Sequence, residues 1–229
     1  MALLTRFFRA AIAIAWKDLR IELRTGEIVT TAGFFAVLVA VMASLAFYGG
    51  PSTAEKVAPG ALWLPVAFAS VLALSRTWQR EREEGALTGI LISPAPRGAI
   101  FVGKAIGVFA FVVAVECVVV PVVALMMHVD LAEALPTLAL LFALGTIGLA
   151  ATGTLFGAMT VRTRARDLVL ASVLFPLLSP TLLAGIGATR ELLSGAPFDE
   201  LYDYFLLFGV FDSVAIAGGI GLFGTLVDE

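Results

Sequence analysis

One stretch of the sequence has the residue types and spacing of a nucleotide-binding loop. Gly98 and Gly103-Lys104 reproduce the GxxxxGK spacing, in which backbone amides and a lysine surround phosphate groups. Ala105 stands where a serine or threonine would bind magnesium, and no predicted strand precedes the glycines. We therefore exclude nucleotide binding by this chain. Lys104 is instead interpreted as a basic anchor at the cytoplasmic end of a membrane-spanning helix.

Two carboxylates lie within apolar runs of the chain. Glu116 is near the middle of the run 99–127, where a carboxylate is costly to bury unless it is paired, hydrated or protonated. Two interpretations stay open: a group that lines a pathway, or a protonated glutamate hydrogen-bonded inside a helix bundle. Asp212 lies nearer the outer end of the last apolar run, and we expect it to reach the membrane interface.

Histidine and cysteine, the other residue types that commonly bind metals, each occur once in the sequence. His128, the only histidine, follows two methionines and could be imagined as a ligand of haem iron, but a polar residue at the end of a helix is the favoured interpretation. Cys117 is the only cysteine, so it forms no internal disulfide, and we expect a small buried apolar residue. The sequence shows no nucleophile–base pair and no metal-ligand set. We predict a non-catalytic chain.

Long apolar segments must position these residues. Of 229 residues, 60% are hydrophobic and 14% are charged, and the mean hydropathy is +1.00. Soluble domains are less apolar and more charged, and a membrane core about 30 Å thick needs about 20 apolar residues for each helical crossing. The sequence therefore predicts an all-α polytopic membrane protein. Its six transmembrane helices are expected at 28–48, 61–77, 99–127, 135–161, 168–188 and 204–227.

Basic residues alternate along the connections between these segments. All of the 15 lysines and arginines except Lys56 and Arg190 lie before the first segment, in or beside the connection between the second and third, or between the fourth and fifth. Arg76 and Lys104 are just inside the facing ends of the second and third segments. Because basic loops stay on the cytoplasmic side, both termini are predicted to be cytoplasmic. The remaining connections are too short for a soluble domain.

The first 27 residues predict an amphipathic helix that precedes a membrane domain, 28–229. Its apolar face contains Phe8, Ile12, Ala15, Trp16, Leu19 and Leu23. Its basic face contains Arg6, Arg9, Lys17, Arg20 and Arg24. This pattern is typical of a helix that lies in the membrane interface, with its basic side chains at the headgroups. The alternative is a helix packed on a soluble partner.

The densest polar stretch, 78–98, joins the second and third segments. We expect a short helix at 81–93 there, because Ser93 precedes a proline that ends a helix. A short cytoplasmic amphipathic helix fits a groove on another protein; the alternative is a helix that rests on its own bundle or on headgroups. The candidate contact residues are Glu81, Arg82, Glu83, Glu84, Gly85, Leu87, Ile90 and Leu91.

A basic turn between the fourth and fifth segments is the second candidate cytoplasmic contact. It contains Arg162, Arg164 and Arg166. These residues supply the positive charge that sets the topology, and they are also suited to a protein partner or to phospholipid headgroups.

Two sequence blocks resemble a known family. Residues 81–104, EREEGALTGILISPAPRGAIFVGK, are similar to the segment that joins spans two and three in ABC-2-type transporter permeases. Residues 145–180, GTIGLAATGTLFGAMTVRTRARDLVLASVLFPLLSP, resemble the CcmB-type haem exporter permeases of cytochrome c maturation. The six spans, the basic N-terminal segment and Phe211-Asp212 in the last span agree with this resemblance.

The resemblance implies a multi-pass permease subunit in the bacterial inner membrane that acts in haem delivery for cytochrome c maturation. A separate ABC ATPase subunit would bind ATP and dock on the helix 81–93. Further implied partners are a second permease copy, other cytochrome c maturation membrane subunits and a haem chaperone, with no role for nucleic acid. Haem is then a transported or handled ligand, and the sequence identifies no cofactor site in this chain.

Two other functions remain open. The same class of permease exports other cargo, such as a drug, a lipid or a polysaccharide. Alternatively, the chain is a non-transporting membrane scaffold that uses ATP-driven motion to release a haem-loaded chaperone.

Overall fold

The computed structural model describes residues 2–47, 51–83, 85–160 and 166–228, and in these ranges the chain is helical without strands. Six helices are long and apolar enough to cross a membrane, which confirms the predicted all-α polytopic fold. They are α2 (Glu27–Ala46), α3 (Pro51–Glu83), α5 (Arg97–Met127), α6 (Leu135–Thr160), α7 (Arg166–Leu193) and α8 (Tyr202–Asp228). The shorter elements are α1 (Ala2–Thr25), α4 (Ala86–Ile92) and the 3-10 helix η1 (Phe198–Leu201).

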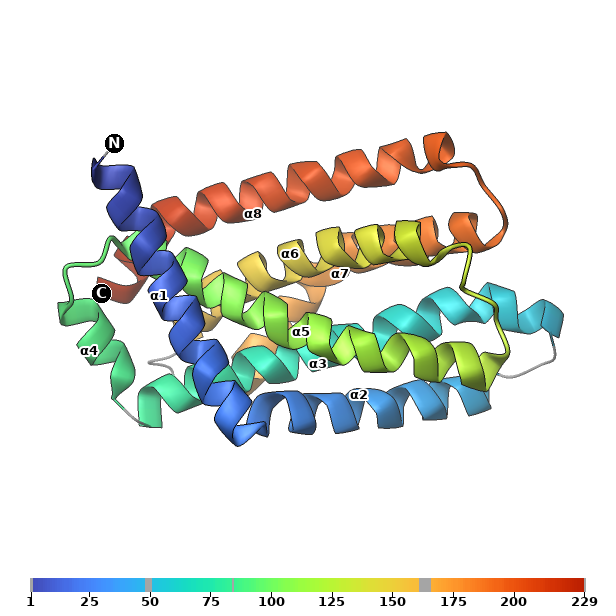
Figure 1. Ribbon diagram of the computed structural model, residues 1–229, viewed down its shortest axis with the longest axis horizontal. Helices are drawn as coiled ribbons and strands as arrows, with labels where there is room; N and C mark the ends of the chain where they lie inside the picture. The colour runs from blue at the N-terminus through green and yellow to red at the C-terminus, as the bar shows by residue number, and fades with distance from the viewer. Residues whose placement is uncertain (1, 48–50, 84, 161–165, 229) are drawn as a thin grey trace.

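The six long helices run side by side along the length of the molecule (Figure 1). Both chain ends, α1 and α4 lie at one end of this bundle, which we call the terminal end. The end of α2, the beginning of α3 and the connections α5–α6 and α7–α8 lie at the opposite end. Helix α5 is central, because it contacts α1, α2, α3, α6 and α8.

The core is built around Trp63 of α3. Its ring is fully buried and stacks on Phe142 with 4.7 Å between ring centroids, and its indole N–H donates to Thr189 at 2.9 Å. Gly145 and Gly185 leave space for the ring, since a Cβ atom on either would lie 2.5 Å from it. The tryptophan therefore joins α3, α6 and α7.

The sequence pattern misplaced the start of the second span. Pro65 and Trp63 are typical of a helix opening near the membrane interface, but α3 begins at Pro51 and both residues lie inside it. Pro51 is well accommodated because it is the first residue of the helix, and Trp63 does not need water because Thr189 accepts its N–H. The connection expected at about 49–60 is therefore mostly helical.

Adjacent glycines on α8 give a matched test of this packing. A Cβ atom on Gly219 would overlap the buried ring of Phe101, whereas a Cβ atom on Gly218 meets open space. Overpacking of a tight core contact costs about 1–3 kcal/mol. We expect Gly219→Ala to lower the thermal unfolding midpoint of the detergent-solubilised protein and Gly218→Ala to leave it unchanged or raise it. Equal midpoints for the two variants would contradict the α5–α8 packing.

Candidate functional site at the terminal end of the bundle

Helix α1 packs across the start of α5 through small and acidic side chains. Ala11, Ile14 and Ala15 are buried beneath it, and Asp18 and Glu22 follow on the same side. At the crossing a Cβ atom on Gly103 would lie 2.6 Å from the carbonyl oxygen of Ala11. A glycine is therefore required where the two helix backbones approach each other.

The apolar face predicted for α1 is divided in two by this packing. Ala15 is buried against the bundle and Leu19 packs at its edge, so neither belongs to the outer surface. The larger side chains face away from the bundle. The exposed apolar residues of α1 are Leu4, Phe8, Ile12, Trp16 and Leu23.

Lys104 lies at the centre of a buried ion-pair cluster that joins three helices. Its ammonium group donates to Asp18 of α1 at 2.8 Å and to Glu81 of α3 through a short contact. Lys17 of α1 donates to the same oxygen of Glu81 at 2.5 Å. The side chain of Lys104 is only 1% exposed, and those of Asp18 and Glu81 are 7% and 4% exposed. We call Lys17, Asp18, Glu81 and Lys104 the ion-pair cluster.

Charge balance makes this burial tolerable. Two lysines face two carboxylates, so each buried charge has an opposite charge within hydrogen-bond distance. Burial alone would lower the pKa of Lys17, but the carboxylates of Asp18 and Glu81 together raise it above its ordinary value. Lys17 therefore remains protonated throughout the physiological range.

The interpretation of Lys104 as a basic anchor at the cytoplasmic end of its span is wrong in the role that it gives the side chain, although the residue does lie near the start of α5. The side chain points into the bundle and not toward headgroups, because two carboxylates lie there. The GxxxxGK spacing also has a packing origin: Gly98 leaves room for Ile220 of α8, and Gly103 leaves room for α1.

A second group of charges lies next to the cluster and holds the joint between α1 and α2. Glu22 accepts the backbone N–H of Val29 at 2.8 Å, which satisfies a free donor in the first turn of α2. Arg80 of α3 lies 3.7 Å from Glu22 and donates to Glu27 at 3.0 Å. The chain turns at Gly26 between the two helices, with a left-handed φ of 62°.

The predicted helix at 81–93 is divided by Gly85. Glu81, Arg82 and Glu83 belong to the end of α3, and α4 begins only at Ala86. The reason is the backbone of Gly85, which has a φ of 64° that residues with a side chain rarely adopt. Glu81 is consequently part of the ion-pair cluster and not of the short helix.

Helix α4 itself projects from the terminal end, between the ends of α3 and α5 (Figure 1). Leu87, Ile90 and Leu91 lie on it as the sequence predicted. Ile90 packs toward the bundle, whereas Ile92 is 80% exposed. Ile92 was not among the predicted contact residues, although its place as the last residue before Ser93-Pro94, where α4 ends, is visible in the sequence.

The structure describes only some of the other residues that were predicted to contact a cytoplasmic partner. Glu84, Arg162 and Arg164 lie outside the described residues, and Arg166 is the first residue of α7. His128 ends α5 with a φ of 55° and is exposed, which agrees with its interpretation as a polar residue at the end of a helix.

The two carboxylates predicted within the membrane are both buried. Glu116 of α5 is 5% exposed and accepts a short hydrogen bond from the hydroxyl of Thr146 on α6. Asp212 is 6% exposed and does not reach the interface as expected, because it packs on Gly148 of α6, where a Cβ atom would lie 2.5 Å from its Oδ1. Cys117, expected to be buried, is exposed on the outer side of α5.

Removal of Lys104 tests the ion-pair cluster. In Lys104→Met the carboxylates of Asp18 and Glu81 lose their buried partner and keep only the half-exposed Lys17. Breaking a buried pair on one side costs about 3–5 kcal/mol, and the remaining contact with Lys17 places the loss at or below this range. We expect a clearly lower thermal unfolding midpoint in detergent, while Lys56→Met, which changes an exposed lysine, leaves it unchanged. The additional change Glu81→Gln should restore part of the loss. A Lys104→Met variant as stable as the parent would contradict the cluster.

The chain is similar to known membrane proteins over most of its length. The CcmB protein family matches residues 9–219. Heme exporter protein B of Bradyrhizobium diazoefficiens is 30% identical over 84% of this chain and 88% of its own length. The proteins of the same name from Pseudomonas aeruginosa and Paracoccus denitrificans are 29% and 30% identical, over 76% and 80% of this chain and 77% and 84% of their own lengths. The family match begins within α1, contains the four residues of the ion-pair cluster and ends within α8, and the chain belongs to the CcmB family.

Proposed function

We propose that this chain is the membrane permease subunit of an ABC transporter that acts in haem export for cytochrome c maturation. A separate ATPase subunit supplies the energy, and this chain receives it at the terminal end of the bundle. Membership of the CcmB family and the six membrane-spanning helices support the permease function. Haem is the transported or handled ligand, and ATP is bound by the partner.

The observation that carries the coupling proposal is the placement of α4. This helix is joined to α3 through Gly85 and to α5 through Pro94-Ala95-Pro96, so a push on it moves the ends of two spanning helices. Its exposed Ile92 offers an apolar contact to a groove on another protein. The ATPase docks here, and the basic segment with Arg162, Arg164 and Arg166 is the second contact.

The ion-pair cluster transmits such a displacement. Glu81 precedes α4 and Lys104 follows it, and the ammonium group of Lys104 donates to both Glu81 and Asp18. Movement of α4 therefore reaches α1 together with α3 and α5. Glu81 contributes from inside the bundle and does not face the ATPase.

The terminal end lies on the cytoplasmic side of the bacterial inner membrane. The alternation of basic residues along the chain supports this orientation. Helix α1, a unit distinct from the permease domain at 28–229, lies in the membrane interface, where its exposed Phe8, Ile12 and Trp16 contact lipid. The permease acts as a homodimer, with further cytochrome c maturation subunits and a haem chaperone as partners.

A charged residue on α4 should prevent ATPase docking. We expect Ile92→Asp, Leu87→Asp and Leu91→Asp each to reduce co-purification of the ATPase subunit at least tenfold, because a carboxylate would have to be desolvated in the contact. Phe198→Asp is the matched control, since Phe198 is 55% exposed at the opposite end of the bundle. That variant should retain the ATPase.

Two further measurements distinguish a loss of ATPase docking from a loss of folding. Membrane insertion and the size-exclusion profile of each variant are measured with the co-purification. Normal ATPase recovery with Ile92→Asp and Leu91→Asp in well-folded protein would contradict docking on α4.

The hydrogen bond between Thr146 and Glu116 favours a second function, that of a non-transporting scaffold. A glutamate that accepts a hydrogen bond from Thr146 inside the bundle fits a packed helix interface better than a polar pathway. Three cavities along the spans, formed by described residues, are lined mainly by apolar side chains. This supports a scaffold in which ATP-driven motion releases a haem-loaded chaperone without moving haem through this chain.

Reconstituted vesicles distinguish the two functions. The complete complex is supplied with ATP, and both haem inside the vesicles and free haem-loaded chaperone are measured. ATP-dependent chaperone release without haem transfer would support the scaffold, whereas haem transfer lost in Lys104→Met would support transport.

A further inference from the structure

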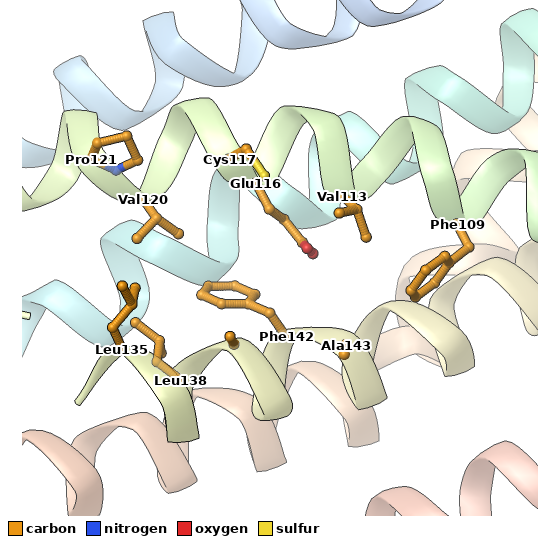
Figure 2. A pocket seen from close by; sticks show the side chains of 11 residues that line it. Phe109, Val113, Glu116, Cys117, Val120, Pro121, Leu135, Leu138, Phe142 and Ala143 are labelled. Carbon is orange, nitrogen blue, oxygen red and sulfur yellow. The ribbon is translucent and has the colours of Figure 1, made fainter. Parts of the chain in front are cut away.

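A groove between α5 and α6 is lined by side chains of both helices (Figure 2). Its lining residues, within 109–121 and 135–143, lie mostly in the halves of the two helices nearer the opposite end. It encloses about 340 Å³. Its rim includes Cys117 and Pro121 of α5 and Ala139 of α6, all of which are exposed. Because these residues belong to membrane-spanning helices, the groove opens toward lipid.

One lining residue carries a carboxyl group. Figure 2 shows the carboxyl group of Glu116 directed into the space between α5 and α6, beside Phe142. Glu116 is eleven residues from the end of α5 at Met127, which places it about 16 Å below that end at 1.5 Å per residue. This is close to the middle of a bilayer core about 30 Å thick.

The carboxyl group is incompletely satisfied. Within the part of the chain that the structure describes, the hydroxyl of Thr146 is its one hydrogen-bond donor, and it contacts only Oε1. The second oxygen has further acceptor capacity at a depth where lipid supplies no donor. A lipid acyl chain in the groove has no hydrogen-bond donor and would leave this second oxygen without a partner.

The groove surface also suits a helix. Ala139 and Ala143 of α6 line it four residues apart, and this small-xxx-small spacing allows a second helix backbone to approach closely. Small residues and a carboxyl group seeking a donor therefore occur on one lipid-facing surface. Side-chain hydrogen bonds between transmembrane helices contribute about 0.6–2 kcal/mol each.

We propose that this groove binds a transmembrane helix of another membrane subunit, one that presents a hydroxyl, amide or amine donor to Glu116 at mid-membrane depth. The inference deepens the proposed function, which includes further membrane subunits as partners. A second copy of this chain fits less well. Ser213, exposed in the middle of α8, already donates its hydroxyl to the carbonyl oxygen of Gly209 at 2.6 Å.

Photo-crosslinking in native membranes that contain the whole complex tests this inference. A benzophenone amino acid replaces Cys117 at the rim of the groove, and the control carries it at Val118, which is 47% exposed on the next position of α5 and does not line the groove. We expect the Cys117 position to give an adduct with one partner subunit at least fivefold more than the Val118 position. Mass spectrometry should place the adduct in a transmembrane helix, within one turn of a residue with a donor side chain.

Three variants examine the chemistry of the contact. Glu116→Gln retains an acceptor and should retain the adduct, whereas Glu116→Leu should reduce it severalfold. Because Glu116→Leu also removes the bond to Thr146, Ala139→Phe provides an independent test: it fills the groove from an exposed position and should abolish the adduct. Leu125→Phe, at a site 75% exposed elsewhere on α5, is its control and should have no effect.

The inference is overturned by adducts with lipid alone, by adducts with a second copy of this chain, or by a partner adduct that survives both Glu116→Leu and Ala139→Phe. ATPase co-purification is measured on the same samples. If a groove variant loses the adduct but recovers the ATPase normally, only the contact in the groove is changed. If the parent complex itself does not retain the ATPase, the proposed function is contradicted and not the groove.

Discussion

The organisation of the terminal end depends on one buried lysine. Lys104 is held by Asp18 from α1 and by Glu81 from α3, so three helices that are distant in sequence meet at a single ammonium group. An ammonium group without these carboxylates would not be buried so deeply, because its loss of hydration costs several kcal/mol. The position of α1 against the bundle and the separation between the ends of α3 and α5 both follow from this contact.

The number of spans and the fold class could be predicted from the sequence because they depend on local quantities. The length of each apolar run is set by the thickness of the membrane, and the runs around Glu116 and Asp212 are long enough on their own. Helix ends were predicted less well. Pro51 and Pro65 give similar local signals, and only the packing of Trp63 among α6 and α7 decides that α3 continues through the second of them.

The candidate site was predicted only in part, because its charges pair over long sequence distances. The polar stretch before Gly85 was recognised, but nothing in the sequence indicates that Glu81 turns inward to Lys17 and Lys104. A basic residue at the end of an apolar run ordinarily marks the membrane surface, and this rule failed for Lys104. Asp212 was misplaced for a related reason, since the space that buries it is created by Gly148 on another helix.

The neutral composition of the ion-pair cluster has an evolutionary consequence. Asp18, Glu81 and Lys104 are shielded from water, so a change of charge at one position is not compensated by solvent and requires a compensating change at another. These positions can therefore diverge only as a set, whereas exposed basic residues such as Arg9 and Arg20 on α1 can be exchanged one at a time. Among related chains, substitutions at Lys104 should accordingly be found together with substitutions at Asp18 or Glu81.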